Sequence, residues 1–187
     1  MGIFDKLKAN AGAAINNAVS NLGNKSETFT FNALPESLAE MQALPEAKLD
    51  TPFKTAALTL CAVCAYAADK QVGAEMLNWL RGPRPLSGMD ISFLNDRFRD
   101  GTHVPFSYFE GATPENDYTP TAPFKVTVES NPYSAANEGY MKLFIKSSGA
   151  DNAREVVMRK LGDGRWMLWD QMLLVSIRDP KSKNPWA

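Results

Sequence analysis

The sequence is poor in the residues that most often mark disulfide frameworks and metal sites. Its 187 residues include 2 cysteines and 1 histidine. Cys61 and Cys64 lie so close in the sequence that a bond between them would close only a trivial loop. A zinc site built on both cysteines would need two more ligands, and the chain offers one histidine and no further cysteine. We therefore predict two buried cysteines that act as small apolar residues, no metal or cofactor, and a reducing, cytoplasmic location.

The chain also lacks an excess of charge of either sign. Lysine and arginine together number 20 and the acidic residues 21, which gives a net charge of -1. A protein without an overall basic field attracts polyanions weakly, so nucleic acid is excluded as the expected partner.

Long apolar runs are absent as well. The most apolar stretch, residues 56–68, is shorter than the about 20 residues that a membrane-spanning helix requires. Polar side chains such as Asp5 and Lys6 interrupt the N-terminal residues. We expect neither a membrane span nor an export signal.

Familiar catalytic motifs are missing too. The chain contains no G-x-S-x-G, no P-loop, no G-x-G-x-x-G and no H-E-x-x-H. Their absence excludes the enzyme classes that depend on them, although an enzyme that uses dispersed carboxylates is still allowed. With 44% hydrophobic and 22% charged residues, the composition is that of a folded globular protein.

Apolar residues recur with a helical period through residues 1–22. Gly23 is a typical stop after such a helix, and a short polar linker follows it. We predict an amphipathic helix within residues 1–24, a single domain at residues 27–180 and a tail at residues 181–187.

The apolar face of this N-terminal helix needs a cover, and three covers stay open. They are its own domain or a second copy of it, a separate protein, and a membrane surface. The membrane surface is the least favoured, because Lys6 and Lys8 are the only basic residues of the helix.

Four further helices are predicted before the chain reaches residue 100. They are expected at residues 35–43, 52–68, 69–81 and 87–99. Thr51 is an N-cap residue type and Pro52 suits the first helical position, while Ser87 and Asp90 form the pattern of a capping box. The helix at 52–68 is apolar nearly all round, so we expect it at the centre of the domain.

Beyond Gly101 the apolar pattern alternates with a period of two, which is typical of strands. Strands are expected at residues 28–31, 104–110, 124–129, 140–146, 154–161 and 165–170. Helices followed by strands predict an α+β fold, with the helices on one face of an antiparallel sheet of about five strands. The loop at residues 111–123 is long enough to be either a functional flap or disordered.

The segment around the single histidine is the best candidate for chemistry. Asp96 and Asp100 share one helix face, and His103 follows shortly after them. Two carboxylates near an imidazole could form an acid–base group or half of a metal site. Against this, Arg99 and its neighbours make the same turn an ordinary solvated helix end. We take Asp100, His103 and Tyr108 as candidate ligand-binding residues and assign no catalytic residue.

Aromatic residues are frequent in the strand region, for example Tyr140, Trp166 and Trp169. Two interpretations stay open: the rings fill the inner face of the sheet, or they line a pocket. Trp166 and Trp169 would face opposite sides of a regular strand, so at least one of them is expected near the surface.

The C-terminal part of the chain resembles a known family. It reads NPYSAANEGYMKLFIKSSGAD from Asn131, then GRWMLWDQMLLVSIRDP, and closes with Asn184-Pro185-Trp186-Ala187. These segments resemble a family of small bacterial proteins that is defined only as a domain of unknown function. The resemblance implies a bacterial source and no known activity, so no functional residues carry over from it.

These observations together predict a non-catalytic binding or protein-interaction module. Its partner would be a second copy or another protein, bound through the N-terminal helix. The alternative is a small-molecule-binding protein or an enzyme, with a pocket between the helices and the sheet that the loop at residues 111–123 closes.

Overall fold

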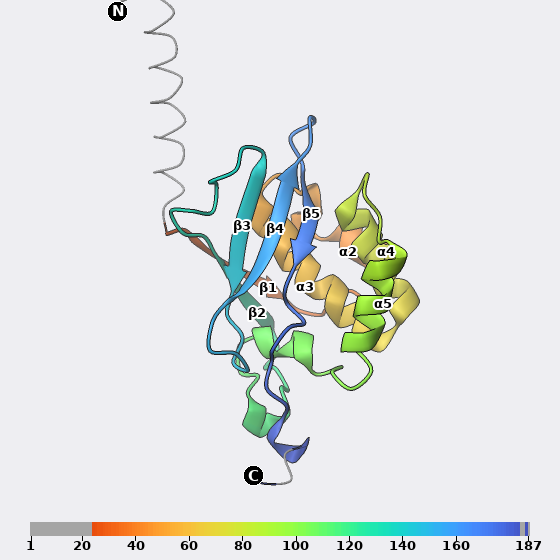
Figure 1. Ribbon diagram of the computed structural model, residues 1–187, viewed down its shortest axis with the longest axis vertical. Helices are drawn as coiled ribbons and strands as arrows, with labels where there is room; N and C mark the ends of the chain where they lie inside the picture. Colours follow the sequence, from red (N-terminus) through yellow and green to blue (C-terminus); the bar gives the residue numbers. More distant parts are fainter. Residues whose placement is uncertain (1–23, 184–185, 187) are drawn as a thin grey trace, which may run out of the picture.

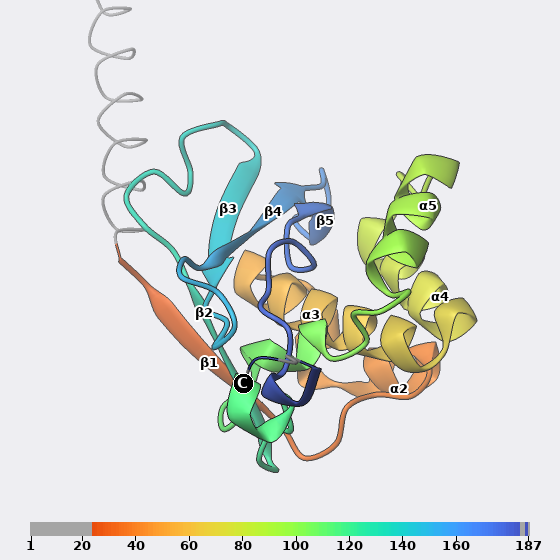
Figure 2. The same cartoon turned by 60° about the horizontal axis from the view of Figure 1, so that its bottom comes forward.

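The computed structural model describes residues 24–183 and Trp186. The predicted N-terminal helix, and the partners that it would bind, lie outside these residues. The described part of the chain is a set of helices packed against one face of a five-stranded sheet (Figures 1 and 2). The predicted α+β fold, with N-terminal helices and a C-terminal antiparallel sheet, is confirmed.

The sheet is a meander in which every strand pairs antiparallel with the next one. From one edge to the other its strands are β1 (Ser26–Phe31), β2 (Phe124–Glu129), β3 (Tyr140–Ile145), β4 (Arg154–Lys160) and β5 (Trp166–Gln171). β1 precedes every helix that the structure describes, yet it pairs along its whole length with β2, from Ser26 opposite Glu129 to Phe31 opposite Phe124. The first strand therefore joins the C-terminal meander as an edge strand.

The longer helices begin at the cap residues that the sequence predicts. In order they are α2 (Leu38–Ala43), the 3-10 turn η1 (Pro45–Lys48), α3 (Pro52–Ala68), α4 (Lys70–Arg81) and α5 (Gly88–Arg97). The Thr51 side chain caps α3 by accepting a hydrogen bond from the Lys54 amide, and Asp69 caps α4 in the same way. Ser87 and Asp90 form the capping box of α5. Among the helices of the described residues, none is long and apolar enough to cross a membrane.

α3 is the centre of the domain, as its apolar sequence predicts. Almost all of its side chains are buried, and it contacts both α4 and the inner face of the sheet. Cys61 and Cys64 lie within this helix as free thiols, 0% and 3% exposed. Burial raises the pKa of both thiols, which keeps them protonated at neutral pH. They serve as small apolar core residues, as predicted.

The prediction of a strand at residues 104–110 is wrong. Residues Val104–Tyr108 form a short 3-10 helix, η2, in which the Ser107 hydroxyl donates to the Val104 carbonyl at 2.7 Å. Pro105 is the signal against a strand, because proline cannot donate a ladder hydrogen bond and suits the first turn of a helix. The sheet still has five strands, since β1 takes part in it.

The loop at residues 111–123 packs onto the C-terminal segment. Two 3-10 turns face each other there, η3 (Pro114–Asn116) in the loop and η4 (Lys181–Lys183) in the C-terminal segment. Tyr118 is 1% exposed, and its hydroxyl donates to the Arg178 carbonyl at 2.7 Å. The loop is therefore an ordered part of the fold, held in place by a buried side chain.

Candidate functional site

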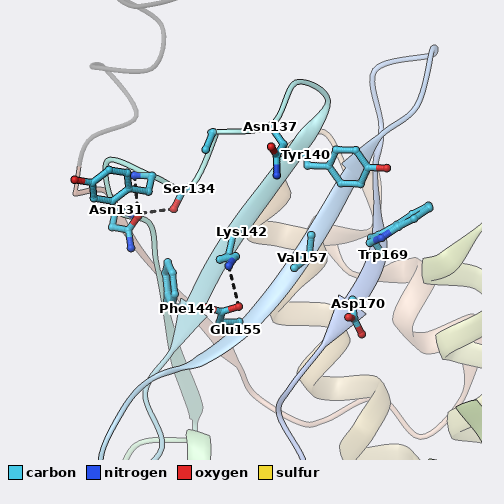
Figure 3. A pocket seen from close by; sticks show the side chains of 12 residues that line it. Asn131, Ser134, Asn137, Tyr140, Lys142, Phe144, Glu155, Val157, Trp169 and Asp170 are labelled. Carbon is cyan, nitrogen blue, oxygen red and sulfur yellow. Dashed lines mark hydrogen bonds and ion pairs between the residues drawn. The ribbon is translucent and has the colours of Figure 1, made fainter.

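The outer face of the sheet, opposite the helices, carries a groove of about 780 Å³. The loop at residues 130–139 and the outward side chains of β3, β4 and β5 enclose it (Figure 3). Its lining combines aromatic, amide and charged groups, principally Asn131, Tyr140, Lys142, Glu155, Val157 and Trp169. We call this feature the outer-face groove.

Strand alternation builds the floor of the outer-face groove. On β3, Met141 and Leu143 are buried against the helices, so Tyr140 and Lys142 point to the opposite face. β4 repeats the alternation and presents Val157 to the groove.

A β-bulge in β5 brings Trp169 to the same face. Val157 on β4 lies opposite Asp170. The next pair skips one residue of β5, because Met158 lies opposite Leu168. Regular alternation would send the neighbours Trp169 and Asp170 to opposite faces, but both line the outer-face groove. The bulge thus places an aromatic ring and a carboxylate side by side at the groove.

The loop at residues 130–139 forms one wall of the groove. β2 pairs with β3 only through its last two residues, so the first half of β3 has no strand beside it on that side. The loop takes this place, and the Ser134 carbonyl accepts a hydrogen bond from the Lys142 amide at 2.8 Å. The Asn131 amide donates to the Ser134 hydroxyl at 2.9 Å, which holds the turn of the loop (Figure 3).

Two arginine side chains, which do not themselves line the groove, lie against the aromatic rings at one end of it. The rings of Tyr140 and Trp169 meet edge to face, with their centroids 5.4 Å apart. The Arg159 guanidinium carbon lies 4.7 Å from the Trp169 ring centroid and 5.2 Å from that of Tyr140. The Arg84 guanidinium carbon lies 4.3 Å from the Trp169 centroid. All three separations fall within the about 6 Å over which a cation is attracted to a ring face.

Charged groups of both signs border the groove. Lys142 Nζ and Glu155 Oε2 form an ion pair at 3.0 Å between β3 and β4, and Asp170 is exposed beside Trp169. Within the described residues, no group of three or more potential metal ligands comes together. The groove can bind a ligand through ring contacts, amide hydrogen bonds and ion pairs.

The structure brings together two of the three predicted ligand-binding residues. Asp100 and His103 line a pocket of about 360 Å³ beyond the end of α5, beside Asp179 of the C-terminal segment. Tyr108 lies elsewhere, buried, and its hydroxyl donates to the Leu173 carbonyl at 2.6 Å. Burial raises the pKa of Tyr108, so this residue is a structural hydrogen-bond donor at neutral pH.

His103 packs as if it were an apolar ring. Both of its ring nitrogens are buried, and neither has a hydrogen-bond partner in the part of the chain that the structure describes. Nε2 lies 3.9 Å from Oδ1 of Asp179, which is too long for a hydrogen bond. The ring stacks on Tyr118, with centroids 5.4 Å apart.

We expect the burial of His103 to make the protein less stable in mild acid. Desolvation, reinforced by Lys183, lowers the pKa of His103 below its ordinary value of 6.5. Asp179 and Asp117 oppose this shift without reversing it. Below pH 6.5 the unfolded chain therefore binds a proton that the folded state resists, so the free energy of unfolding falls as the pH falls toward the folded pKa.

Urea denaturation of the wild type and of His103→Phe, at about pH 7.5 and about pH 5.5, measures this effect. Phenylalanine keeps the stack on Tyr118 and does not titrate, so the variant should lose less stability than the wild type on acidification. The contributions of the other titrating groups to the pH dependence are the same in both proteins, so they cancel in the comparison. A wild type that gains stability relative to the variant in acid would show instead that protonated His103 pairs with Asp179.

The sequence did not identify the two arginines at the groove, for different reasons. Arg84 lies 85 residues from Trp169 and meets it only in the folded chain. The Gly82–Pro85 turn, which carries Arg84, indicates a rigid bend but not what the bend faces. Arg159 has a usable signal, since it alternates with the inward Met158 on β4 and lies directly opposite Tyr140.

Comparison with known families adds one finding. Residues 33–181 match a family described as a domain of unknown function, DUF6935. No curated protein and no solved structure matches the chain significantly. The match extends over α2, α3, α4 and α5 and over four of the five described strands, so the shared region includes the outer-face groove.

Proposed function

The chain belongs to the DUF6935 family of unknown function, and we propose that it is a non-catalytic binding protein that recognises a peptide segment of a partner in its outer-face groove. The observation that carries this proposal is the pair of rings of Tyr140 and Trp169 on an open face of the sheet. Tyrosine, tryptophan and arginine are the residue types that dominate binding energy at protein interfaces.

The shape of the groove also favours a peptide. It runs over neighbouring strands on the outer surface and has a wall that includes Tyr133, which is 80% exposed. Most small-molecule sites enclose their ligand in a concavity, whereas an extended peptide can lie along an open sheet face.

A small-molecule site between the helices and the sheet has less support. The cavity bounded by α4, α5 and β5 has a volume of about 50 Å³, which is room for one or two water molecules. A larger pocket of about 570 Å³ lies between the C-terminal end of α3, residues 32–36 and Phe124. Its lining includes none of the three candidate ligand-binding residues and no residue of the loop at residues 111–123. Of the candidate residues, Tyr108 already uses its hydroxyl in a hydrogen bond to the Leu173 carbonyl. The ring nitrogens of His103 are buried, so a ligand in the neighbouring pocket cannot reach them.

The proposal predicts that replacing both rings of the groove abolishes peptide binding. Random short peptides displayed on phage would be selected against the full wild-type chain, and the enriched peptides would be titrated by calorimetry. We expect Tyr140→Ala/Trp169→Ala to bind them at least about tenfold more weakly, because tyrosine and tryptophan side chains contribute most to binding energy at protein interfaces.

A matched control removes two exposed apolar side chains from another surface. Met89 and Ile91 lie on α5, 83% and 41% exposed. Met89→Ala/Ile91→Ala should bind the selected peptides like the wild type, with both variants checked for an unchanged thermal midpoint. Selection of no peptide, or of peptides that bind equally well without Tyr140 and Trp169, would refute the proposal.

A further inference from the structure

We infer that the ligand of the outer-face groove is an acidic peptide segment, and that Arg84 and Arg159 bind its carboxylates. This inference rests on the proposed function and specifies the chemistry of the ligand. Its starting point is that two guanidinium groups from separate elements stack on one tryptophan, Trp169.

Arg159 is oriented but unpaired. It is exposed on β4, and its guanidinium lies against the rings of Trp169 and Tyr140. A cation–π contact uses the charge of a guanidinium and none of its N–H donors as a hydrogen bond. Over residues 24–183, this side chain forms no hydrogen bond and no ion pair.

Arg84 is held in place by the turn that carries it. Pro83 and Pro85 flank it and restrict its backbone, and the buried Arg81 donates from Nε to the Arg84 carbonyl at 3.0 Å. One Arg84 nitrogen, Nη1, donates to the Trp169 carbonyl at 3.1 Å on the edge strand β5. The other donors of Arg84 stay available, so both arginines are positioned before any ligand binds.

The two guanidiniums beside Trp169 favour the binding of an anion from outside the chain. Both guanidiniums place a positive charge beside the Trp169 ring, and an anion that comes close to either one is attracted to it. The carboxylates of the groove are engaged elsewhere: Glu155 pairs with Lys142, and Asp170 accepts a backbone amide hydrogen bond. Among the residues that the structure describes, no carboxylate lies within ion-pair distance of either arginine, although the charge of Arg84 helps to lower the pKa of Asp90. Arginine binds carboxylates through two parallel hydrogen bonds, so a ligand carboxylate fits this position.

The rest of the groove favours a peptide over a nucleic acid as the source of the anion. Asn131 and Asn137 present side-chain amides to the groove. The Asn131 Oδ1 already accepts a hydrogen bond from the Tyr133 backbone amide at 2.9 Å, and its NH2 group can donate to a peptide backbone. Glu155 and Asp170 lie in the same groove, and together with the net charge of -1 they oppose a polyphosphate chain. A peptide segment with one or two carboxylates among neutral residues can bind these amides through its backbone and carries too few negative charges to be repelled by Glu155 and Asp170.

The test uses the full chain and a fluorescein-labelled peptide of alternating glutamate and glycine, with a glutamine–glycine peptide as the neutral match. Fluorescence anisotropy should show binding of the glutamate peptide alone. R159Q and R84Q should each weaken it about tenfold, the loss typical of one partner in a charged pair. R159K keeps the charge but loses the planar fork, so it should fall between R159Q and the wild type.

The control is R165Q, which removes the same charge from the β4–β5 hairpin, where Arg165 pairs with Asp163. R165Q should bind the glutamate peptide like the wild type, and thermal unfolding confirms that every variant is folded. Equal losses in R159Q and R165Q would show a general charge effect and overturn the inference. Tighter binding of a labelled oligothymidylate, lost in R159Q, would overturn it in favour of nucleic acid.

Failure of this inference can be told apart from failure of the proposed function. If phage-selected peptides lose affinity in Tyr140→Ala/Trp169→Ala but not in R84Q or R159Q, the groove binds peptides and the acidic specificity is wrong. If no selected peptide depends on the two rings, the proposed function itself is wrong.

Discussion

Replacing Gly73 with alanine is expected to destabilise the protein by about 3 kcal/mol, although alanine ordinarily favours a helix. Gly73 lies in the first turns of α4, where the chain has just left α3. A Cβ atom at this position would overlap the backbone of Tyr66 in α3. Backbone atoms cannot turn aside as a side-chain tip can, so the two helices would have to separate. Urea denaturation would measure the loss as a lower midpoint with an unchanged slope.

Gly88 supplies the matched control. It is the first residue of α5, and a Cβ atom built there would meet no atom within 4 Å. Gly88→Ala should leave stability unchanged or raise it by less than about 1 kcal/mol, because alanine restricts the unfolded chain. Equal effects of the two substitutions would show that α3 and α4 do not approach as closely as the structure indicates.

The contact at Gly73 also bears on the groove. α4 ends in the Gly82–Pro85 turn, which positions Arg84 over Trp169. Gly82 has a φ of +57° and lies against Met167 of β5, so this turn is fitted closely to the edge of the sheet. Separation of α3 from α4 would therefore move Arg84 relative to the ring on which it stacks.

Features of this fold that depend on nearby residues could be predicted from the sequence. Thr51 and Pro52 mark the start of α3 because capping and proline geometry involve only the first helical turn. Ser87 and Asp90 mark α5 for the same reason. The alternation of β3 and β4 follows from the pleat of a single strand, and it predicts which side chains share a face.

Features that depend on distant residues could not be predicted in the same way. The bulge at Trp169 arises from how β4 and β5 align, and the sequence of β5 alone does not predict it. Arg84 reaches the groove only because α4 packs beside β5. The sequence grouped Tyr108 with Asp100 and His103 by proximity along the chain, but η2 turns Tyr108 inward toward Leu173.

The burial of α3 leads to the second large effect: Leu60→Ala should lower the free energy of unfolding by about 3 kcal/mol. Leu60 is 0% exposed in the helix that packs on both the sheet and α4. The substitution removes buried methyl groups and leaves a cavity, because close-packed neighbours on several sides can relax only in part. Urea denaturation gives the loss, and the peptide-binding affinity of the folded fraction should stay unchanged.

Ile91→Ala removes a similar aliphatic side chain from an exposed position of α5, where Ile91 is 41% exposed. Its expected cost is below about 1 kcal/mol, since little apolar surface returns to water. A small loss in Leu60→Ala, comparable to that of Ile91→Ala, would contradict the central position of α3. The contrast between the two variants therefore tests the packing on which the sheet, and with it the outer-face groove, depends.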